Sequence, residues 1–334
     1  MADSLGHAPT LAKPRASVEP VVVMIEILAA LAPIFLVIAL GAALRRAGWL
    51  TDGFWDGAEK LVYYGLFPCL LFRKAATAPL DQLAAGPVAL TLLGAILGTG
   101  LAAFALRPAL KLSPAAFGSV LQGSIRMNTY VGFAAAAALA GEVGAAAAAL
   151  CAAVMVPSVN ALSIIALTGL HGGAEGARPT GPRLAWRIVR GLALHQLIAA
   201  ILAGAALNLA DLPIPPLVDP ATEILAAGAL PMALLTVGAG LRLSALKEAG
   251  RAMGAAVFLK LALHPALAAG IAFSVGLDGA VLLTVMIFAA LPSSASGYHM
   301  ARRMGGDAPL LAGVISAQTL AAAVTLPAII LLLR

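Results

Sequence analysis

Long apolar segments with few charged residues run through nearly the whole chain of 334 residues. Charged side chains make up 11% of the sequence, whereas a soluble globular protein carries roughly 25% and needs them to cover its surface. Transmembrane β-strands would alternate apolar and polar residues over short segments, but these runs are long and unbroken. The sequence therefore predicts an all-α integral membrane protein.

A helix needs about 20 residues to cross a bilayer, and the sequence contains ten apolar runs of a suitable length. They cover about 25–44, 59–75, 86–106, 114–138, 142–169, 185–209, 221–241, 250–275, 279–301 and 308–333. Residues 1–22 are polar and are predicted to form a disordered extension. The first run is longer than the apolar core of a signal peptide and is followed by Arg45 and Arg46, so we expect a retained helix.

The Lys and Arg residues predict the orientation of the chain. If the first helix enters from outside, fourteen of them lie on the cytoplasmic side and five on the outer side, with Arg126 and Lys260 inside spans. Because basic loops face the cytoplasm, both termini are predicted to face outward. The net charge of +6 then reflects loops rather than a nucleic-acid partner. Cys69 and Cys151 lie in apolar runs and no metal-ligand spacing occurs, so no disulfide, metal or other cofactor is predicted.

The two halves of the chain share short matches in the same order, at an offset of 163 to 165 residues. The matching segments are 40–44 with 203–207, 66–71 with 229–234, and 141–142 with 306–307. Five helices per half is an odd number, so the second half is predicted to insert upside down. Inverted repeats of this kind are typical of secondary transporters, whose substrate site lies near the midplane. We expect repeats over 23–169 and 185–334, joined by a cytoplasmic linker over 170–184.

Two polar patches interrupt predicted helices 4 and 9 at equivalent positions of the repeats. The first runs from Gln122 to Gly132, and the second from Leu291 to His299. Pro292 removes a backbone donor, and freed backbone groups are tolerated at that depth where they line a cavity or are buried in protein. We therefore predict that helices 4 and 9 break and cross there. The alternative is that Ser, Thr and Asn side chains bond back to their own helices and only bend them.

Two cations lie deep in the predicted spans with no acidic residue at a similar depth. Arg126 lies about 18 Å into its span at 1.5 Å per residue, and Lys260 lies in helix 8 with His264 one turn later. Such cations, with the positive ends of half-helices, favour an anionic substrate, or else they bond freed carbonyls and brace the breaks. The predicted substrate-binding residues are Arg126, Asn128, Thr129, Tyr130, Asn160, Lys260, Pro292, Ser293, Ser294, Ser296 and Gln318, and the proton-relay candidates are His264 and His299.

An ordered set of short motifs runs through the chain from about Ile25 onward. The motifs are 32–35 with Gly41 and 45–46, 61–64 with Pro68 and 71–72, 126–128 with Gly132, 141–142, Asn160, Pro231 with 234–235 and Gly238, 260–261, and 291–292. Together they resemble the auxin efflux carrier family, whose bacterial members include malonate or malate permeases. The resemblance implies a scaffold of helices 1, 2, 6 and 7, through which a homodimer would form, beside a transport domain of helices 3–5 and 8–10. It also implies a multi-pass protein of a bacterial inner membrane.

These observations predict a secondary carrier of small organic carboxylates that works by alternating access. An anion channel stays open as an alternative, because a pore would use the same cations. A cation/proton antiporter of similar design is disfavoured, because it needs deep carboxylates. A membrane-embedded enzyme is disfavoured as well, since lipid-phosphate chemistry would need an acidic metal cluster or a nucleophile–base pair, and Asp-rich clusters are absent from the sequence. No Walker loop is present, so gradients or the substrate itself would supply the energy.

Overall fold

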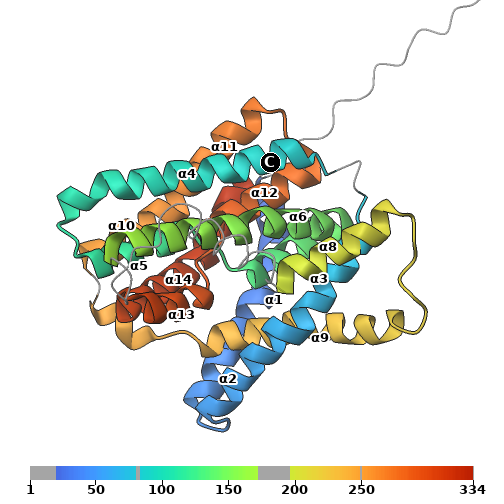
Figure 1. The fold of residues 1–334 in the computed structure, drawn as a ribbon, viewed down its shortest axis with the longest axis horizontal. Helices are drawn as coiled ribbons and strands as arrows, with labels where there is room; N and C mark the ends of the chain where they lie inside the picture. The colour runs from blue at the N-terminus through green and yellow to red at the C-terminus, as the bar shows by residue number, and fades with distance from the viewer. Residues whose placement is uncertain (1–19, 80–82, 172–195, 249, 334) are drawn as a thin grey trace, which may run out of the picture.

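The computed structural model describes residues 20–79, 83–171, 196–248 and 250–333, and every regular element in those ranges is a helix (Figure 1). In chain order the elements are α1 (Pro20–Arg46), α2 (Asp52–Leu61), η1 (Val62–Leu66), α3 (Phe67–Ala76), α4 (Ala85–Leu110), α5 (Pro114–Ile125), α6 (Thr129–His171), α8 (Gln196–Leu209), α9 (Asp219–Ala239), η3 (Leu243–Glu248), α10 (Arg251–Phe258), η4 (Leu259–Leu263), α11 (His264–Ser274), α12 (Gly279–Ala290), α13 (Ala295–Met304) and α14 (Ala308–Leu332). The all-α prediction is confirmed for the described residues.

Six helical stretches in the described ranges are long and apolar enough to cross a bilayer, and one bent pair would make a seventh. The six are Val21–Arg46, Ala85–Leu110, Pro114–Leu167, Asp219–Ala239, Arg251–Ser274 and Ala308–Leu332, and the pair is Gly279–Ala290 with Ala295–Met304. The prediction of a multi-pass membrane protein is confirmed by these stretches. The count of ten spans stays a prediction, because 59–75 is divided among short helices and 185–209 begins outside the described residues.

The helix α1 begins at Pro20, so its first turn occupies the last residues of the predicted extension over 1–22. The rest of that extension, and most of the predicted linker over 170–184, lie outside the described residues. The helix α6 is interrupted at Gly141, which has a φ of 58° and a ψ of −143°. Glycine accepts this conformation without a steric penalty, so the break falls where the sequence predicted a boundary between two spans.

Two of the helical paths contain a π-helical turn shortly before a proline. The turn η1 lies ahead of Pro68, and the turn η4 lies ahead of Pro265. A proline lacks the N–H that bonds to the carbonyl four residues earlier, and its ring crowds that carbonyl. A wider turn accommodates this without ending the helix. The chain therefore continues through α2, η1 and α3, and through α10, η4 and α11, and the second path carries Lys260 in its π turn.

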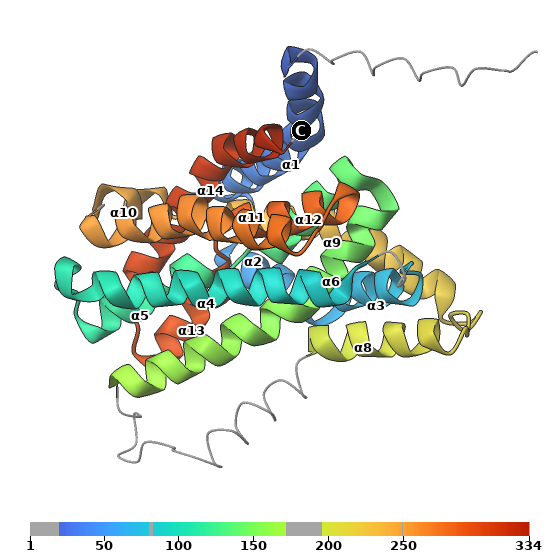
Figure 2. The same cartoon turned by 90° about the horizontal axis from the view of Figure 1, so that it is seen from above.

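Two sets of helices have their most extensive contacts among themselves. In the first set α1 packs on α9 and α3 packs on α8 and α9, while in the second α4 packs along α11 and α6 along α12. Figure 2 shows α3 beside α8 and α4 beside α11. The backbones of α1 and α9 lie so close together that a Cβ at Gly41 would overlap the carbonyl of Leu235, and a Cβ at Gly238 would overlap the carbonyl of Ile38. Small residues at such contacts let helix backbones approach within a membrane.

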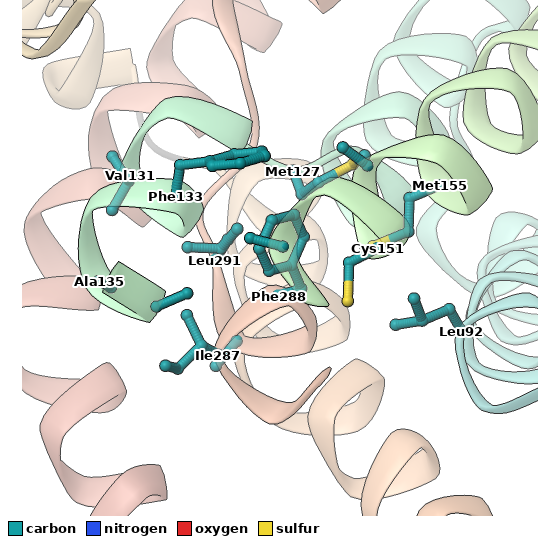
Figure 3. Close-up of a cluster of buried hydrophobic side chains, with 14 of the residues drawn as sticks. Leu92, Met127, Val131, Phe133, Ala135, Cys151, Met155, Ile287, Phe288 and Leu291 are labelled. Carbon is teal, nitrogen blue, oxygen red and sulfur yellow. The ribbon is translucent and has the colours of Figure 1, made fainter. Parts of the chain in front are cut away.

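An apolar cluster fills the contact between α6 and α12, next to the points at which α5 and α12 end. The rings of Phe133 and Phe288 stack edge to face with their centroids 6.2 Å apart. Figure 3 shows Met127 and Leu291 beside them, and all four side chains are buried. A Cβ at Gly132 would press against Leu291 and the Phe288 ring, so this glycine lets α6 and α12 pack closely. The cluster holds the two helix breaks against each other from one side.

Candidate functional site: two helix breaks and a buried arginine

The first break separates α5 from α6. The helix α5 ends at Ile125, and Arg126 has an extended backbone with a φ of −76° and a ψ of 159°. The side-chain oxygen of Asn128 then accepts hydrogen bonds from the backbone N–H groups of Tyr130 at 3.2 Å and Val131 at 3.4 Å. Asparagine is among the residues that best cap a helix N-terminus in this way. The polar residues of the patch therefore end one helix and start the next.

The second break separates α12 from α13. The helix α12 ends at Ala290, and both Leu291 and Ser294 have extended backbones. Pro292 lies between them and cannot donate the hydrogen bond that would continue α12. The axis of α13 is bent by 44° from that of α12. Leu291, Pro292 and Ser293 are buried, so the unwound backbone runs through the protein interior.

The two breaks touch each other. The backbone N–H of Asn128 donates to the carbonyl of Pro292 at 2.8 Å. The side chain of Gln318 on α14 ties further freed backbone groups together. Its oxygen accepts from the N–H of Ser293 at 2.9 Å, and its nitrogen donates to the carbonyls of Gly123 at 2.9 Å and Ala256 at 3.0 Å. Backbone groups that would otherwise be unpaired at this depth are thereby satisfied.

Arg126 lies at the first break with 3% of its surface exposed. Its Nε donates to the side-chain oxygen of Gln122 at 3.2 Å, and its two terminal nitrogens reach Ser296 Oγ at 3.2 Å, Asn160 Oδ1 at 3.0 Å and Met300 Sδ at 3.1 Å. All four acceptors are neutral, and no carboxylate among the described residues pairs with the guanidinium. A buried arginine of this kind is a strong attractor for an anion with two oxygens.

The N-terminus of α13 lies beside this guanidinium. The hydroxyl groups of Ser294 and Ser296 are 2.7 Å apart, and Ser296 is exposed while Ser294 is half-buried. A helix N-terminus carries a positive partial charge and N–H groups that favour anions. An anion that enters past Ser296 would therefore meet two hydroxyl groups, a helix N-terminus and then the charge of Arg126.

Lys260 has different surroundings. Its side chain is fully buried in the π turn η4, and its Nζ donates to the carbonyl of Ala289 at 3.2 Å in the last turn of α12. A cation at the C-terminal end of a helix offsets the partial negative charge there. His264, one turn later, is also fully buried, and its Nδ1 lies 2.9 Å from Thr99 Oγ1 on α4. Neither side chain shares a hydrogen-bond partner with Arg126.

The other predicted site residues lie around the breaks with separate contacts. Thr129 and Tyr130 begin α6 half-buried, and the ring of Tyr130 packs edge to face on Phe67 with centroids 4.7 Å apart. His299 is exposed on α13, and its Nε2 lies 3.5 Å from Glu59 Oε1 on α2. This contact is an ion pair whenever the histidine is protonated, and it lies one turn from Ser296 along α13.

Two contacts of Arg126 were not predicted as site residues. Gln122 was visible in the polar patch, and its position four residues before Arg126 places both on one helix face, a signal that would have found it. Met300 carried no such signal, because a methionine has no charge and more often fills space in a core than it accepts a hydrogen bond. A cleft of about 390 Å³ lies away from the breaks, between α3 and α9. Its cations are already paired, Arg73 with Asp219 and Lys74 with Glu142.

Two comparisons with known proteins identify the family of this chain. The model of the family described as "Membrane transport protein" matches residues 26–330. A protein of Rhizobium meliloti (strain 1021) named "Putative malonate transporter" is 27% identical over 329 residues, which cover 93% of this chain and 97% of that relative. The resemblance found in the sequence motifs is thereby confirmed. The chain belongs to the membrane transport protein family, the family of the auxin efflux carriers.

Proposed function

We propose that this protein is a secondary carrier of small organic carboxylate anions that works by alternating access. The observation that carries the proposal is the environment of Arg126, a buried guanidinium with neutral partners beside the N-terminus of α13. A carboxylate can bind a guanidinium fork through two charge-assisted hydrogen bonds. The malonate in the name of the Rhizobium meliloti relative is an anion of this class.

In the proposed site Arg126 binds the carboxylate, and the hydroxyl groups of Ser294 and Ser296 donate to it. Asn160 orients the guanidinium through its bond to a terminal nitrogen. The substrate would replace the weak contacts of Arg126 with Ser296 and Met300, both of which involve neutral acceptors. In this proposal the other predicted residues shape the crossing of the two breaks: Asn128, Thr129, Tyr130, Lys260, Pro292, Ser293 and Gln318.

The proposed movement separates a scaffold of α1–α3, α8 and α9 from a transport domain of α4–α6 and α10–α14. The same proposal includes ten membrane spans arranged as an inverted repeat. The repeats cover 23–169 and 185–334, and both termini lie outside. The close contacts of α1 with α9 and of α3 with α8 support a rigid scaffold. Among the residues that the structure describes, the ion pairs that link the proposed bodies are those of His299 with Glu59 and of Lys74 with Glu142. Pairs with exposed members are weak, so a boundary that they bridge can open.

The experiment is uptake and counterflow of labelled malonate in proteoliposomes that contain the purified protein. The wild type is compared with Arg126→Gln, and Arg46→Gln serves as the matched control because Arg46 is exposed at the end of α1. We expect saturable exchange that is lost in Arg126→Gln and kept in Arg46→Gln. Conductance without saturation would instead indicate an anion channel. Exchange of cations without movement of any carboxylate would contradict the proposed substrate class.

A further inference from the structure

The proposed substrate site contains one full positive charge. Among the described residues, the cations enclosed in the membrane region are Arg126 and Lys260. The ammonium of Lys260 donates to the carbonyl of Ala289 at the end of α12, whereas Arg126 contacts α5, α13 and the second part of α6. Because the ammonium of Lys260 is bonded to the end of α12 and shares no partner with Arg126, it does not contribute a charge to the site around Arg126.

The other groups around Arg126 are neutral or already paired. Gln122, Asn160, Ser296 and Met300 carry no charge, and the phenol of Tyr63 on η1, which interacts electrostatically with the guanidinium, is of a type that is neutral at physiological pH. The histidine on α13, His299, is exposed and lies against Glu59, so its charge when protonated is offset by that carboxylate. The N-terminus of α13 adds about half a charge, which is less than a second carboxylate needs.

We infer that the transported species carries a single negative charge, so that a dicarboxylate such as malonate is carried as the monoanion with its second carboxyl protonated. The inference rests on the proposed function and specifies its substrate. A dianion would leave one carboxylate without a cation in an enclosed site, and an unpaired buried charge is strongly unfavourable. A protonated carboxyl, an amide or a hydroxyl group instead suits the neutral side chains of Asn160, Ser294 and Ser296, which exchange hydrogen bonds without charge.

The test is the pH dependence of uptake for two solutes of almost the same shape, malonate and its half-amide malonamate. Proteoliposomes with the wild-type protein are given each solute at a limiting concentration, from below to well above the second ionisation of malonic acid. The malonate monoanion becomes about tenfold rarer with each further pH unit. We expect malonate uptake to fall in that proportion, while malonamate, which keeps one negative charge throughout, changes by less than about twofold.

Two variants assign the pH dependence to the charge of the site. Ser296→Lys adds a second cation beside Arg126, so we expect it to accept the dianion and to flatten the malonate profile. His299→Gln removes the nearby titratable histidine, and the fall in malonate uptake should persist in it. A fall that disappears in His299→Gln would overturn the inference, because the protein rather than the substrate would then be titrating.

The outcomes separate the inference from the function on which it rests. Saturable uptake of both solutes, with malonate uptake level or rising as the monoanion disappears, would overturn the single-charge inference alone. The absence of saturable uptake for either solute would overturn the proposed carboxylate carrier, and the inference with it. Uptake of malonamate at every pH, together with the expected fall for malonate, would support both.

Discussion

Arg126 and Lys260 are both enclosed cations, yet the two regions around them differ in the kind of partner that they offer. Arg126 directs its donors to side chains, one of which, Ser296, is exposed. Lys260 donates to one backbone carbonyl at the end of α12. Side-chain partners can be exchanged for a ligand, whereas the carbonyl at a helix end is a fixed part of the fold. The depth of a cation in the membrane therefore does not show whether it binds substrate. The kind of group that accepts its hydrogen bonds is the better guide.

The largest expected effect is on transport in Arg126→Gln. Removal of one member of a desolvated, hydrogen-bonded charge pair costs about 3 kcal/mol, which corresponds to a loss of about a hundredfold in affinity. Counterflow of labelled malonate in proteoliposomes measures this loss, and the variant should keep its elution profile in gel filtration. Transport within about threefold of wild type would remove Arg126 from the binding site and with it the contrast to Lys260.

A second expected effect concerns the stability of the two helix breaks. Gln318→Leu leaves the N–H of Ser293 and the carbonyls of Gly123 and Ala256 without their partner. We expect a loss of about 2 kcal/mol in stability, seen as a lower melting temperature in detergent. Thr319→Val is the matched control, because the buried Thr319 hydroxyl donates to the carbonyl of Ile315 in its own helix. Equal melting temperatures for Gln318→Leu and the wild type would show that Gln318 does not brace the breaks.

The sequence predicted both helix breaks at the polar patches that contain Arg126 and Pro292, because a proline and a cluster of polar residues in an apolar run have few other stable arrangements. It did not predict what each polar residue contacts. The π turn that carries Lys260 shifts the faces of its helix, and Pro265 alone does not predict it, because Pro231 lies within α9 without such a turn. Gln318 was predicted to bind substrate, but its amide contacts three backbone groups that meet only in the folded chain.

Three sequence predictions concern the arrangement of the whole chain in the membrane. The inverted orientation of the second half, the outward position of both termini and the homodimer through the scaffold stay predictions. The inverted repeat was inferred from a few short matches in an alanine-rich sequence. It also requires the predicted span 185–209, of which the structure describes α8. The family and the membrane location could be predicted, because ordered motifs and long apolar runs depend little on the details of packing.

A third expected effect sharpens the role of the neutral partners of Arg126. Asn160→Asp places a carboxylate where Asn160 Oδ1 lies, 3.0 Å from the guanidinium. This carboxylate would pair with Arg126 and compete with the substrate, so we expect transport to fall about tenfold. Asn160→Ala, which removes a single neutral contact, should reduce transport by only about threefold. If Asn160→Asp transports as well as Asn160→Ala, the site does not depend on an uncompensated charge at Arg126.

The smallest expected effect is in Lys260→Met. The substitution removes a buried ammonium that has one acceptor and fills the space with an unbranched apolar side chain. Loss of the ammonium removes the cost of keeping a charge away from water, but it also leaves the carbonyl of Ala289 without its donor. These two effects oppose each other, so we expect transport within about threefold of wild type and a melting temperature close to that of wild type. A loss of transport as large as that in Arg126→Gln would mean that both cations bind the substrate.

The most direct test of the account is calorimetric titration of malonate into the purified protein in detergent, at a pH at which the malonate monoanion is abundant. Wild type, Arg126→Gln and Lys260→Met are compared at equal protein concentration. We expect saturable binding to the wild type and to Lys260→Met, and no measurable binding to Arg126→Gln. Binding that survives in Arg126→Gln, or that is lost in Lys260→Met, would contradict the assignment of the anion site to Arg126.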